Sequence, residues 1–389
     1  MGLQRELAPF VWGGVWRGQK SPIFNEGVGV FFTSLYVRYF RNLDDARVDF
    51  SPRINQVIGK NAEGKTSLLE ALYLCMSGSS FRTLRLKDTI SYGKEGFFVE
   101  ARFEKEGSEQ VLTISYDGDK RRVLLNSHPV SSSTLLGLIP GVVWTPEDSE
   151  LIKGAPSVRR RFLDIHLCQK DPLYVRHLYR FLRALKQRNA LLRMRNIQAI
   201  TVWEKELAES AAYLVAQRKK TLDALQPLAR DYFAFFTEVP LFTLEYRTTI
   251  PPDMPSDEMK KAYLAEFAKK RDTELHYGMT LVGPHRDDFL VLCKERSAKE
   301  FASEGQKRLF ALSLKLAEWH CMKETLRIAP IMLLDDFGAF LDREKLERLF
   351  TFLSQKLGQV FVANHQRIDS HKTSDMHTFQ MQQGKITIL

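Results

Sequence analysis

The spacing of hydrophobic and polar positions changes along the chain. Apolar and polar residues alternate from residue 34, ending in a short buried strand at Ile58. They alternate again in residues 97–126, which predicts antiparallel hairpins with Gly-Asp turns. After about residue 150 the apolar positions follow helical spacing, most clearly in 203–236 and 257–271. Strand-like patterning returns from about residue 278.

This order indicates an α/β domain that is split in two by a helical insertion. We expect residues 33–150 and 278–389 to form the α/β domain and residues 151–277 to form the insertion. A chain of 389 residues is too long for one compact core, which agrees with such a division. One face of the first long helix of the insertion carries Leu178, Phe181, Leu182, Leu185 and Leu192.

Residues 1–32 have neither periodicity nor a motif, and we predict a tail outside the fold. An alternative is that translation starts further in, near Val28 or Val30. The opening, MGLQRELAPFVWGGVWRGQK, breaks its apolar stretch with Gly-Gly and Arg and makes a poor signal peptide. No apolar run approaches the ~18 residues of a membrane span. We therefore expect a cytoplasmic protein without a membrane partner.

Charge and cysteine content narrow the possible partners. Lys and Arg exceed Asp and Glu by 57 − 47 = 10. This surplus favours polyanions such as nucleic acid, although many basic proteins bind none. The 4 cysteines are far apart without a Cys-x-x-Cys, which argues against a zinc site or a disulfide framework and fits a reducing cytoplasm.

A P-loop follows the strand that ends at Ile58. The segment VIGKNAEGKTSLLEAL fits Gly-x-x-x-x-Gly-Lys-[Ser/Thr] between an apolar strand and an apolar helix. Backbone N–H groups would surround the phosphates of ATP, Lys65 would approach the β- and γ-phosphates, and Thr66 would coordinate Mg²⁺. A Gly-rich turn before a helix is the alternative. The candidate nucleotide-binding residues are Gly59, Lys60, Asn61, Ala62, Glu63, Gly64, Lys65, Thr66 and Ser67.

An acid pair follows a second apolar run, in APIMLLDDFGAFLD. The continuous run from Ile331 to Leu334 predicts a parallel strand covered on both faces. Asp335 would hold Mg²⁺ directly or through water, and Asp336 would orient or activate the attacking water. His365, after the strand in LGQVFVANHQRI, occupies the place of a switch histidine facing the γ-phosphate. A solvated turn and a surface histidine are the alternatives.

The segment FASEGQKRLFALSLKLAEW begins an apolar helix with a Ser-x-x-Gln capping box formed by Ser303 and Gln306. A helix start of this composition also suits a phosphate. The sequence of P-loop, insertion, Ser-Glu-Gly-Gln and acid pair resembles the heads of ABC-type ATPases. By this resemblance the fold class is an ABC-type P-loop ATPase head with an inserted α-helical domain.

The chain resembles the RecF family more closely, a family of bacterial recombination-repair ATPases related to the heads of SMC and Rad50 proteins. The resemblance covers about nine tenths of the chain, from residue 34 onward. Its motifs occur in the family's order: YFRNL, IGKNAEGKTSLLEAL, SFRT, WTPEDSELIKGAPSVRRRFLD, LKQRNALL, GMTLVGPHRDDF, FASEGQKRLFALSLKLAEW and IMLLDDFGAFLD. The P-loop alone is generic, whereas VGPHRDDF together with RRRFLD is specific.

The resemblance implies an ATP-dependent DNA-binding protein of DNA repair, recombination and replication. ATP would lie between two copies, where Ser303, Gly305 and Gln306 of one copy meet the γ-phosphate held by Lys65 of the other. Asp342 would be the D-loop residue of this interface. Arg41 and Asn42 would line the nucleotide. The family assists loading of the RecA recombinase at single-strand gaps together with RecO and RecR, which implies a nucleoid-associated location.

Three departures from the family pattern bear on catalysis. Ala62 replaces an inner glycine of the P-loop, which costs on the order of 1 kcal/mol if the position needs φ > 0. Phe340 stands where the D-loop usually has Glu. No Gln occurs in VVWTPED, so Glu147 is a weak substitute for a Q-loop residue. These three departures bear on the rate of ATP hydrolysis more than on the binding of ATP.

Basic segments offer candidate DNA contacts. Arg159–Arg161 and the Arg-rich face in residues 176–195 are the densest, and such cations contact phosphates. For any single arginine, a solvated helix face or an ion pair with acids of the head is the favoured alternative. In GPHRDD, Arg286 beside Asp287 and Asp288 favours an internal ion-pair corner over DNA contact.

Three functions fit these motifs. The first is an ATP-switched DNA clamp with slow hydrolysis. The second is an ATP-binding scaffold for recombination partners with negligible turnover, favoured by Ala62 and the altered D-loop. The third is the energising subunit of a transporter, which the helical insertion and the lack of membrane-coupling features disfavour.

Overall fold

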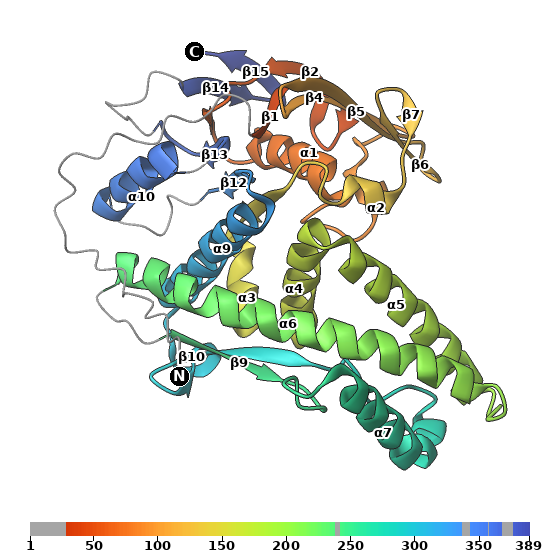
Figure 1. The fold of residues 1–389 in the computed structure, drawn as a ribbon. Coiled ribbons are helices and arrows are strands. Elements are labelled where there is room, and N and C mark those ends of the chain that lie inside the picture. Colours follow the sequence, from red (N-terminus) through yellow and green to blue (C-terminus); the bar gives the residue numbers. More distant parts are fainter. Residues whose placement is uncertain (1–28, 238–241, 337–342, 357, 368–375) are drawn as a thin grey trace.

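Two six-stranded sheets form one end of the molecule and a bundle of long helices forms the other (Figure 1). This computed structural model describes residues 29–389 except 238–241, 337–342, 357 and 368–375. The residues assigned to the N-terminal tail thus lie almost entirely outside the described part. No helix in the described ranges is long and apolar enough to cross a membrane.

The first sheet is antiparallel, in the order β2-β1-β4-β5-β6-β7. The predicted hairpins are confirmed, because β4 pairs with β5 and β5 with β6 in antiparallel register. The first strand begins at Val30 and buries Val30 and Phe32 in the core. Residues 30–32 therefore belong to the fold, and the predicted tail, 1–32, is too long by these residues. The strands are β1 (Val30–Phe40), β2 (Leu43–Asp49), β4 (Phe97–Lys105), β5 (Ser108–Tyr116), β6 (Arg121–Leu125) and β7 (His128–Pro129).

The second sheet has the order β15-β14-β3-β13-β12-β8 and is parallel except for the pair β14–β15. Every residue of β8, β12 and β13 is buried. This burial confirms the prediction from the apolar run Ile331–Leu334, since parallel strands are covered on both faces. The strands are β3 (Ile54–Ile58), β8 (Gly141–Trp144), β12 (Ile331–Asp335), β13 (Val360–Asn364), β14 (Met376–Gln382) and β15 (Lys385–Ile388).

Helices cover the second sheet on both faces. Helix α1 (Lys65–Ser77) shares one core with the antiparallel sheet and with residues of β3, β12 and β13. Residues of α9 (Glu304–Leu326) and α10 (Arg343–Lys356) form a second core with the same strands. The carboxyl ends of β3 and β12 thus lead directly into the P-loop and the acid pair, as the motifs require.

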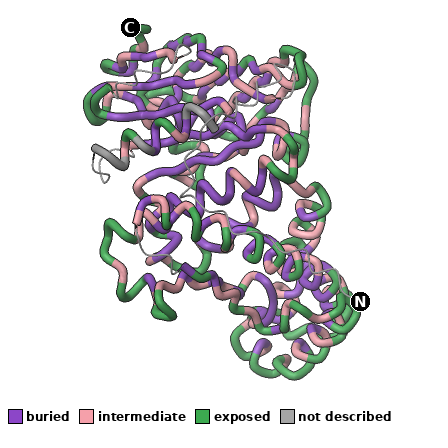
Figure 2. The backbone as a smooth tube through the Cα atoms, turned by 60° about the vertical axis from the view of Figure 1, so that its left-hand side comes forward, coloured by how far each residue is buried: buried purple, intermediate pink, exposed green. Residues whose placement is uncertain are grey.

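The other end of the molecule, which we call the lobe, is built mainly from four helices. They are α4 (Pro156–Lys170), α5 (Pro172–Arg193), α6 (Ile200–Phe236) and α7 (Ser256–Tyr277). Buried positions run through the lobe as well as through the sheets (Figure 2). Helix α6 connects the two ends, because Phe233 stacks on Phe310 of α9 with ring centroids 4.1 Å apart.

The lobe is not purely helical, contrary to our prediction. Strand β9 (Phe242–Arg247) pairs with β10 (Asp288–Cys293), which continues into β11 (Arg296–Ser297). This sheet crosses the predicted boundary at residue 277, so the domain limits stay a prediction. The remaining short elements are η1 (Leu86–Thr89), α2 (Ser132–Leu135), η2 (Pro146–Ser149), α3 (Glu150–Lys153) and α8 (Ala298–Phe301).

Candidate functional site

The P-loop joins the end of β3 to the first turn of α1, and two glycines shape it. A Cβ atom on Gly59 would lie 2.5 Å from the carbonyl oxygen of Met381, so no side chain fits there. Gly64 has a φ of 118°, which side chains rarely tolerate. The loop thus approaches its surroundings through its backbone, which is the form a phosphate cradle needs.

The outer part of the loop is anchored to the turn between β14 and β15. The backbone N–H of Gly384 donates to the carbonyl oxygen of Glu63 over 2.9 Å. The N–H of Gln383 donates to the Glu63 carboxylate. Lys60 and Asn61 are exposed at the tip of the loop. A turn about 320 residues away in sequence therefore holds the P-loop in place.

Asn42 fixes the loop from the side of the antiparallel sheet. Its amide nitrogen donates to the carbonyl oxygen of Ala62 over 3.1 Å, and its amide oxygen accepts from the Ser67 hydroxyl over 2.7 Å. Ala62 has a φ of 65°, in the left-handed region that disfavours a side chain, so this alanine is strained. Asn42 contacts the loop from outside, as a positioning residue would.

Arg41, predicted to line the nucleotide, is held by a carboxylate. Its guanidinium donates to both oxygens of Glu70 on α1, over 2.9 and 2.7 Å, and to the carbonyl oxygen of Asp88 over 2.6 Å. Glu70 is fully buried and also accepts from Ser80. No motif in the sequence points to Glu70 as the partner of Arg41. The available signal was a single acid inside the apolar run SLLEALYL.

Lys65 is buried at the start of α1 and folds back over the loop. Its ammonium donates to the carbonyl oxygens of Gly59 and Lys60, both over 2.8 Å. Burial lowers the pKa of Lys65, and the nearby carboxylates of Asp336 and Asp335 partly oppose that effect. The charge lies among acceptor oxygens, where an anionic phosphate could replace the carbonyl groups.

Thr66 and Asp335, predicted separately as metal ligands, are in direct contact. The Thr66 hydroxyl donates to the Asp335 carboxylate over 3.1 Å. Burial raises the pKa of Asp335 to about 6, an effect that the Thr66 hydrogen bond opposes and that the charges of Asp336 and Glu147 add to. Glu147 therefore lies close enough to act on this site. A hydroxyl and a carboxylate oxygen are hard donors that suit Mg²⁺.

Asp336 and His365 follow neighbouring parallel strands. The N–H of Asp336 donates to the carbonyl oxygen of Ala363 over 2.8 Å, with a φ of 46° at Asp336. Asp335 is in register with Ala363, so His365 lies just beyond the same edge of the sheet and is exposed. The fold thus places both candidates at the end of the sheet that bears the P-loop.

The Ser303 segment forms the start of α9. The predicted capping box is confirmed: the N–H of Gln306 donates to the Ser303 hydroxyl over 3.2 Å, and the N–H of Ser303 donates to the Gln306 side chain over 2.9 Å. Ser303, Gly305 and Gln306 are exposed, and a Cβ on Gly305 would meet only the Ser303 hydroxyl, at 4.0 Å. Among the described residues, no hydrogen bond or ion pair joins this segment to the P-loop. Asp342 and Phe340 lie outside the described residues.

Most of the conspicuous arginines are engaged within the protein. Arg159 forms a bidentate pair with Asp288, over 2.6 and 2.9 Å, and the buried Arg188 lies 2.6 Å from Glu274. The predicted ion-pair corner in GPHRDD therefore exists, but with Arg159 in place of Arg286, whose guanidinium donates to the sulfur of Met279. The exposed cations of α5 are Arg176, Arg183, Lys186 and Arg193.

A family model described as the RecF/RecN/SMC N terminal domain matches residues 31–387. The "DNA replication and repair protein RecF" of Protochlamydia amoebophila is 46% identical over 332 residues, which cover 85% of this chain and 92% of that protein. The chain belongs to the RecF family. The RecF protein of Chlamydia caviae is 34% identical, with 91% and 97% of the two chains covered.

RecF structures agree with this fold over most of the chain. A recombination mediator protein RecF with ATP, from the RecFOR pathway, superimposes with a TM-score of 0.86 at 26% identity, covering 94% of this chain and 99% of that one. The structure of an SMC head bound to a ScpA domain superimposes with a TM-score of 0.54 at 16% identity, covering 92% of this chain and 97% of that one. This similarity supports the fold alone. This RecF-family chain is thus a member of a group of DNA replication and repair proteins with an ABC-type α/β head.

Proposed function

We propose that this chain binds ATP and Mg²⁺ between two copies of itself and, in that dimer, holds duplex DNA beside single-strand gaps during recombinational repair and replication. The observation that carries the proposal is the contact between Thr66 and Asp335 at the mouth of the P-loop, together with Lys65. Family membership and the name of the ATP-bound RecF relative support it.

Each residue of the P-loop site has a task in this proposal. The Lys65 ammonium exchanges its two carbonyl acceptors for phosphate oxygens. Thr66 and Asp335 are the ligands for Mg²⁺, whose chemistry is to neutralise charge that develops on the phosphates. Asp336 orients water, and His365 faces the γ-phosphate. The other residues proposed to bind nucleotide are Gly59, Lys60, Asn61, Ala62, Glu63, Gly64 and Ser67, with Arg41 and Asn42 beside them.

The dimer rests on the exposed start of α9. Ser303, Gly305 and Gln306 present a hydroxyl, an open helix end and an amide to solvent, and within the described ranges no hydrogen bond joins them to the P-loop of their own chain. A second copy would supply that phosphate, and Asp342 would contribute at the same interface. Family membership supports this arrangement, in which the ATP site is complete only between two chains.

DNA, RecO and RecR are the partners that we propose for the dimer. A net charge of +10 supports binding to a polyanion. The relatives named for the RecFOR pathway support RecO and RecR as protein partners and a role in recombinase loading. The corresponding location is the cytoplasm, at the nucleoid.

Retention of gapped and blunt duplexes with ATP, with ADP and without nucleotide tests this function. We expect ATP to increase retention, most on the gapped duplex, and Lys65→Ala to abolish both this increase and ATP-dependent dimerisation. Lys261→Ala, the same exchange at an exposed lysine of α7, is the control. A Lys65→Ala protein that dimerises on ATP as well as the parent would refute the ATP-sandwiched dimer.

An ATP-binding scaffold with negligible turnover is the second candidate, and the strained φ of Ala62 favours it. Phosphate release with and without duplex DNA separates the two. DNA-stimulated release supports the clamp with slow hydrolysis, whereas binding of ATP without any release supports the scaffold.

A further inference from the structure

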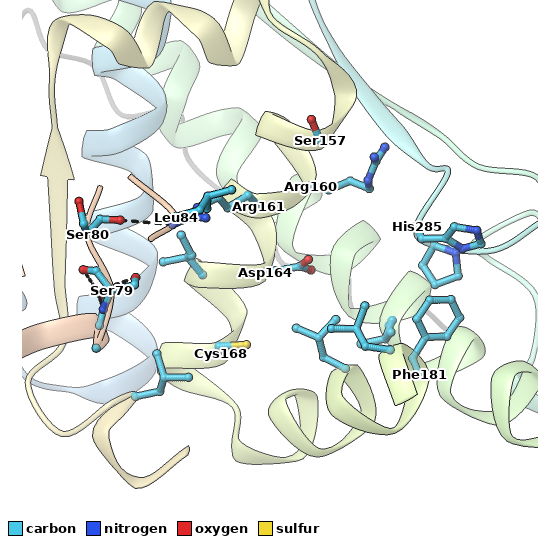
Figure 3. A pocket seen from close by; sticks show the side chains of 18 of the residues that line it. Ser79, Ser80, Leu84, Ser157, Arg160, Arg161, Asp164, Cys168, Phe181 and His285 are labelled. Carbon is cyan, nitrogen blue, oxygen red and sulfur yellow. Dashed lines mark hydrogen bonds between the residues drawn. The ribbon is translucent and has the colours of Figure 1, made fainter. Parts of the chain in front are cut away.

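A cavity of about 730 Å³ lies between the lobe and the segment that follows α1. In Figure 3, Ser80 of that segment lies on one side and Arg160 of α4 and Phe181 of α5 lie on the other, while the side chain of Arg161 lies beside Leu84. Its apolar lining includes Leu84, Leu136, Ile165, Leu178, Phe181 and Leu182. None of the roles proposed above uses this cavity.

Three arginines at the cavity donate to backbone carbonyl oxygens. Arg160 donates to the carbonyl oxygen of Asp287 over 2.7 Å, Arg161 to that of Ser80 over 3.4 Å, and Arg121 to that of Gly78. Within the part of the chain that the structure describes, none of the three forms an ion pair. Backbone carbonyls compensate only part of a guanidinium charge, so these groups gain from an anion.

The two remaining charged groups of the lining neutralise each other. Arg218 lies 2.8 Å from Asp164, which also accepts from the Tyr174 hydroxyl over 2.6 Å. The cavity therefore has a positive surplus. Burial lowers the pKa of Arg160, with a further contribution from nearby Arg218, whereas the carboxylates of Asp288, Asp287 and Asp164 raise it. Burial likewise lowers the pKa of Arg121. At Arg160 the effect of burial thus exceeds that of the nearby carboxylates.

The apolar lining continues onto the surface. The side chains of Leu84 and Leu182 are 83% and 52% exposed and both line the cavity. Single exposed leucines are ordinary, but leucines gathered at the mouth of an apolar cavity indicate an interaction site. A small molecule would fill the interior and leave these mouth residues in water. An extended partner would cover both.

The chemistry distinguishes a protein partner from nucleic acid. Nucleic acid is bound through phosphates and by stacking of bases on exposed aromatic rings. Here the exposed apolar groups are aliphatic, and the aromatic ring of the lining, Phe181, is buried. We propose that this cavity docks an acidic segment of a protein partner, whose leucine-like side chains enter the apolar lining while its carboxylates pair with Arg121, Arg160 and Arg161.

Fluorescence anisotropy on the full-length protein tests this docking. The probe is a labelled amphipathic peptide with leucines at i, i+3, i+4 and i+7 and glutamates elsewhere. We expect saturable binding that Leu84→Asp weakens by about tenfold, the effect of losing one well-buried anchor. Leu182→Asp should act in the same direction, and it replaces Leu84→Asp if that variant loses its far-UV dichroism.

Three comparisons make the outcome decisive. Met194→Asp adds the same charge just after the end of α5, at a residue that is 75% exposed and does not line the cavity, so it should bind like the parent. A peptide with lysines for glutamates should not bind. Gapped duplex DNA should not displace the acidic peptide. The proposal is overturned if the peptide shows no saturable binding, or if Met194→Asp loses as much affinity as Leu84→Asp. It is overturned in favour of nucleic acid if duplex DNA displaces the peptide and Leu84→Asp also loses DNA retention.

Discussion

Ala62 is a non-glycine residue of the P-loop with a positive φ. Its φ of 65° belongs to the left-handed region, which costs an L-residue roughly 1–2 kcal/mol. Asn42 holds the carbonyl oxygen of Ala62, so the loop keeps this conformation despite the cost. The energy stored at Ala62 is one reason to expect a loop that binds nucleotide less tightly than a glycine loop would.

Replacement of this alanine by glycine tests the strain. We expect Ala62→Gly to raise the free energy of unfolding by about 0.5–1 kcal/mol, because relief of the left-handed strain exceeds the entropy that glycine loses. Urea unfolding measures this change, provided that the m value, the slope of the unfolding free energy against urea concentration, is the same in both proteins. Gly107→Ala is the matched control. It lies at φ 76° with no atom within 4 Å of the added Cβ and should lose stability by about 1 kcal/mol. If Ala62→Gly is less stable than the parent, the alanine is not strained.

At the scale of elements, α9 links the nucleotide end of the molecule to the lobe through buried charges. Lys315 of α9 lies 3.7 Å from Asp148 of η2 and 3.4 Å from Glu318 one turn later. Glu318 lies 4.0 Å from the ring of His166 on α4. Burial lowers the pKa of His166 well below its ordinary value, so that ring is neutral.

Glu318 should make stability depend on pH. Burial raises its pKa from 4.5 to about 7, although Lys315 opposes the shift. Between these values the folded state binds more protons than the unfolded state, so this group lowers stability as pH rises. We expect Glu318→Gln to match the parent near pH 5 and to exceed it by on the order of 1–3 kcal/mol near pH 7.5.

Urea unfolding of both proteins across this range measures the difference. His166 is present in both proteins and contributes a dependence of opposite sign in each. Lys315 keeps Asp148 as a partner in the variant. Curves that stay parallel from pH 5 to pH 8 would show that Glu318 does not titrate in this window.

The elements that could be predicted from the sequence are those whose pattern lies within one short segment of the chain. The P-loop, the hairpins of β4–β6, the apolar run of β12 and the capping box of α9 each occupy a short segment with its own pattern. Strand β9 was missed because its partner β10 lies beyond α7, and pairing across that distance leaves no local trace. Glu70 and Glu318 were missed for the same reason, since their partners come from other elements.

The same limit applies to the candidate site. Thr66 and Asp335 were predicted separately from their motifs, and their contact needed the fold. Arg41 was predicted as a nucleotide contact, but its ion pair with buried Glu70 shows a structural task that no motif encodes. Arg159 and Arg188 lie in segments named as candidate DNA contacts, for which an ion pair was among the favoured alternatives, and both form internal ion pairs in the structure.

At the scale of the whole molecule, the P-loop and the start of α9 belong to one chain but, in the proposed dimer, to different ATP sites. Two copies make two sites, each with Lys65 from one chain and Ser303 from the other. A variant in either residue alone damages both sites of its homodimer. A mixed dimer of the two variants is different, because it combines both defects in one site and leaves the other site intact.

Subunit mixing therefore tests this division of labour. We expect Lys65→Ala and Ser303→Arg each to fail in ATP-dependent dimerisation, since each lacks a contact with the γ-phosphate in both sites. Mixed in equal amounts with ATP, they should form a heterodimer with one complete site, detected by energy transfer between labels on the two variants. The heterodimer should hydrolyse ATP at up to about half the rate per dimer of the parent, because one of two sites works.

A mixture of Ser303→Arg and Gln306→Arg is the control. It should not recover dimerisation, because both substitutions alter the start of α9 and each of the two ATP sites therefore still contains one defect. If the first mixture also fails while Ser303→Arg alone still binds ATP, the phosphate contact of Ser303 is not made across a dimer, and the start of α9 acts only as a helix cap.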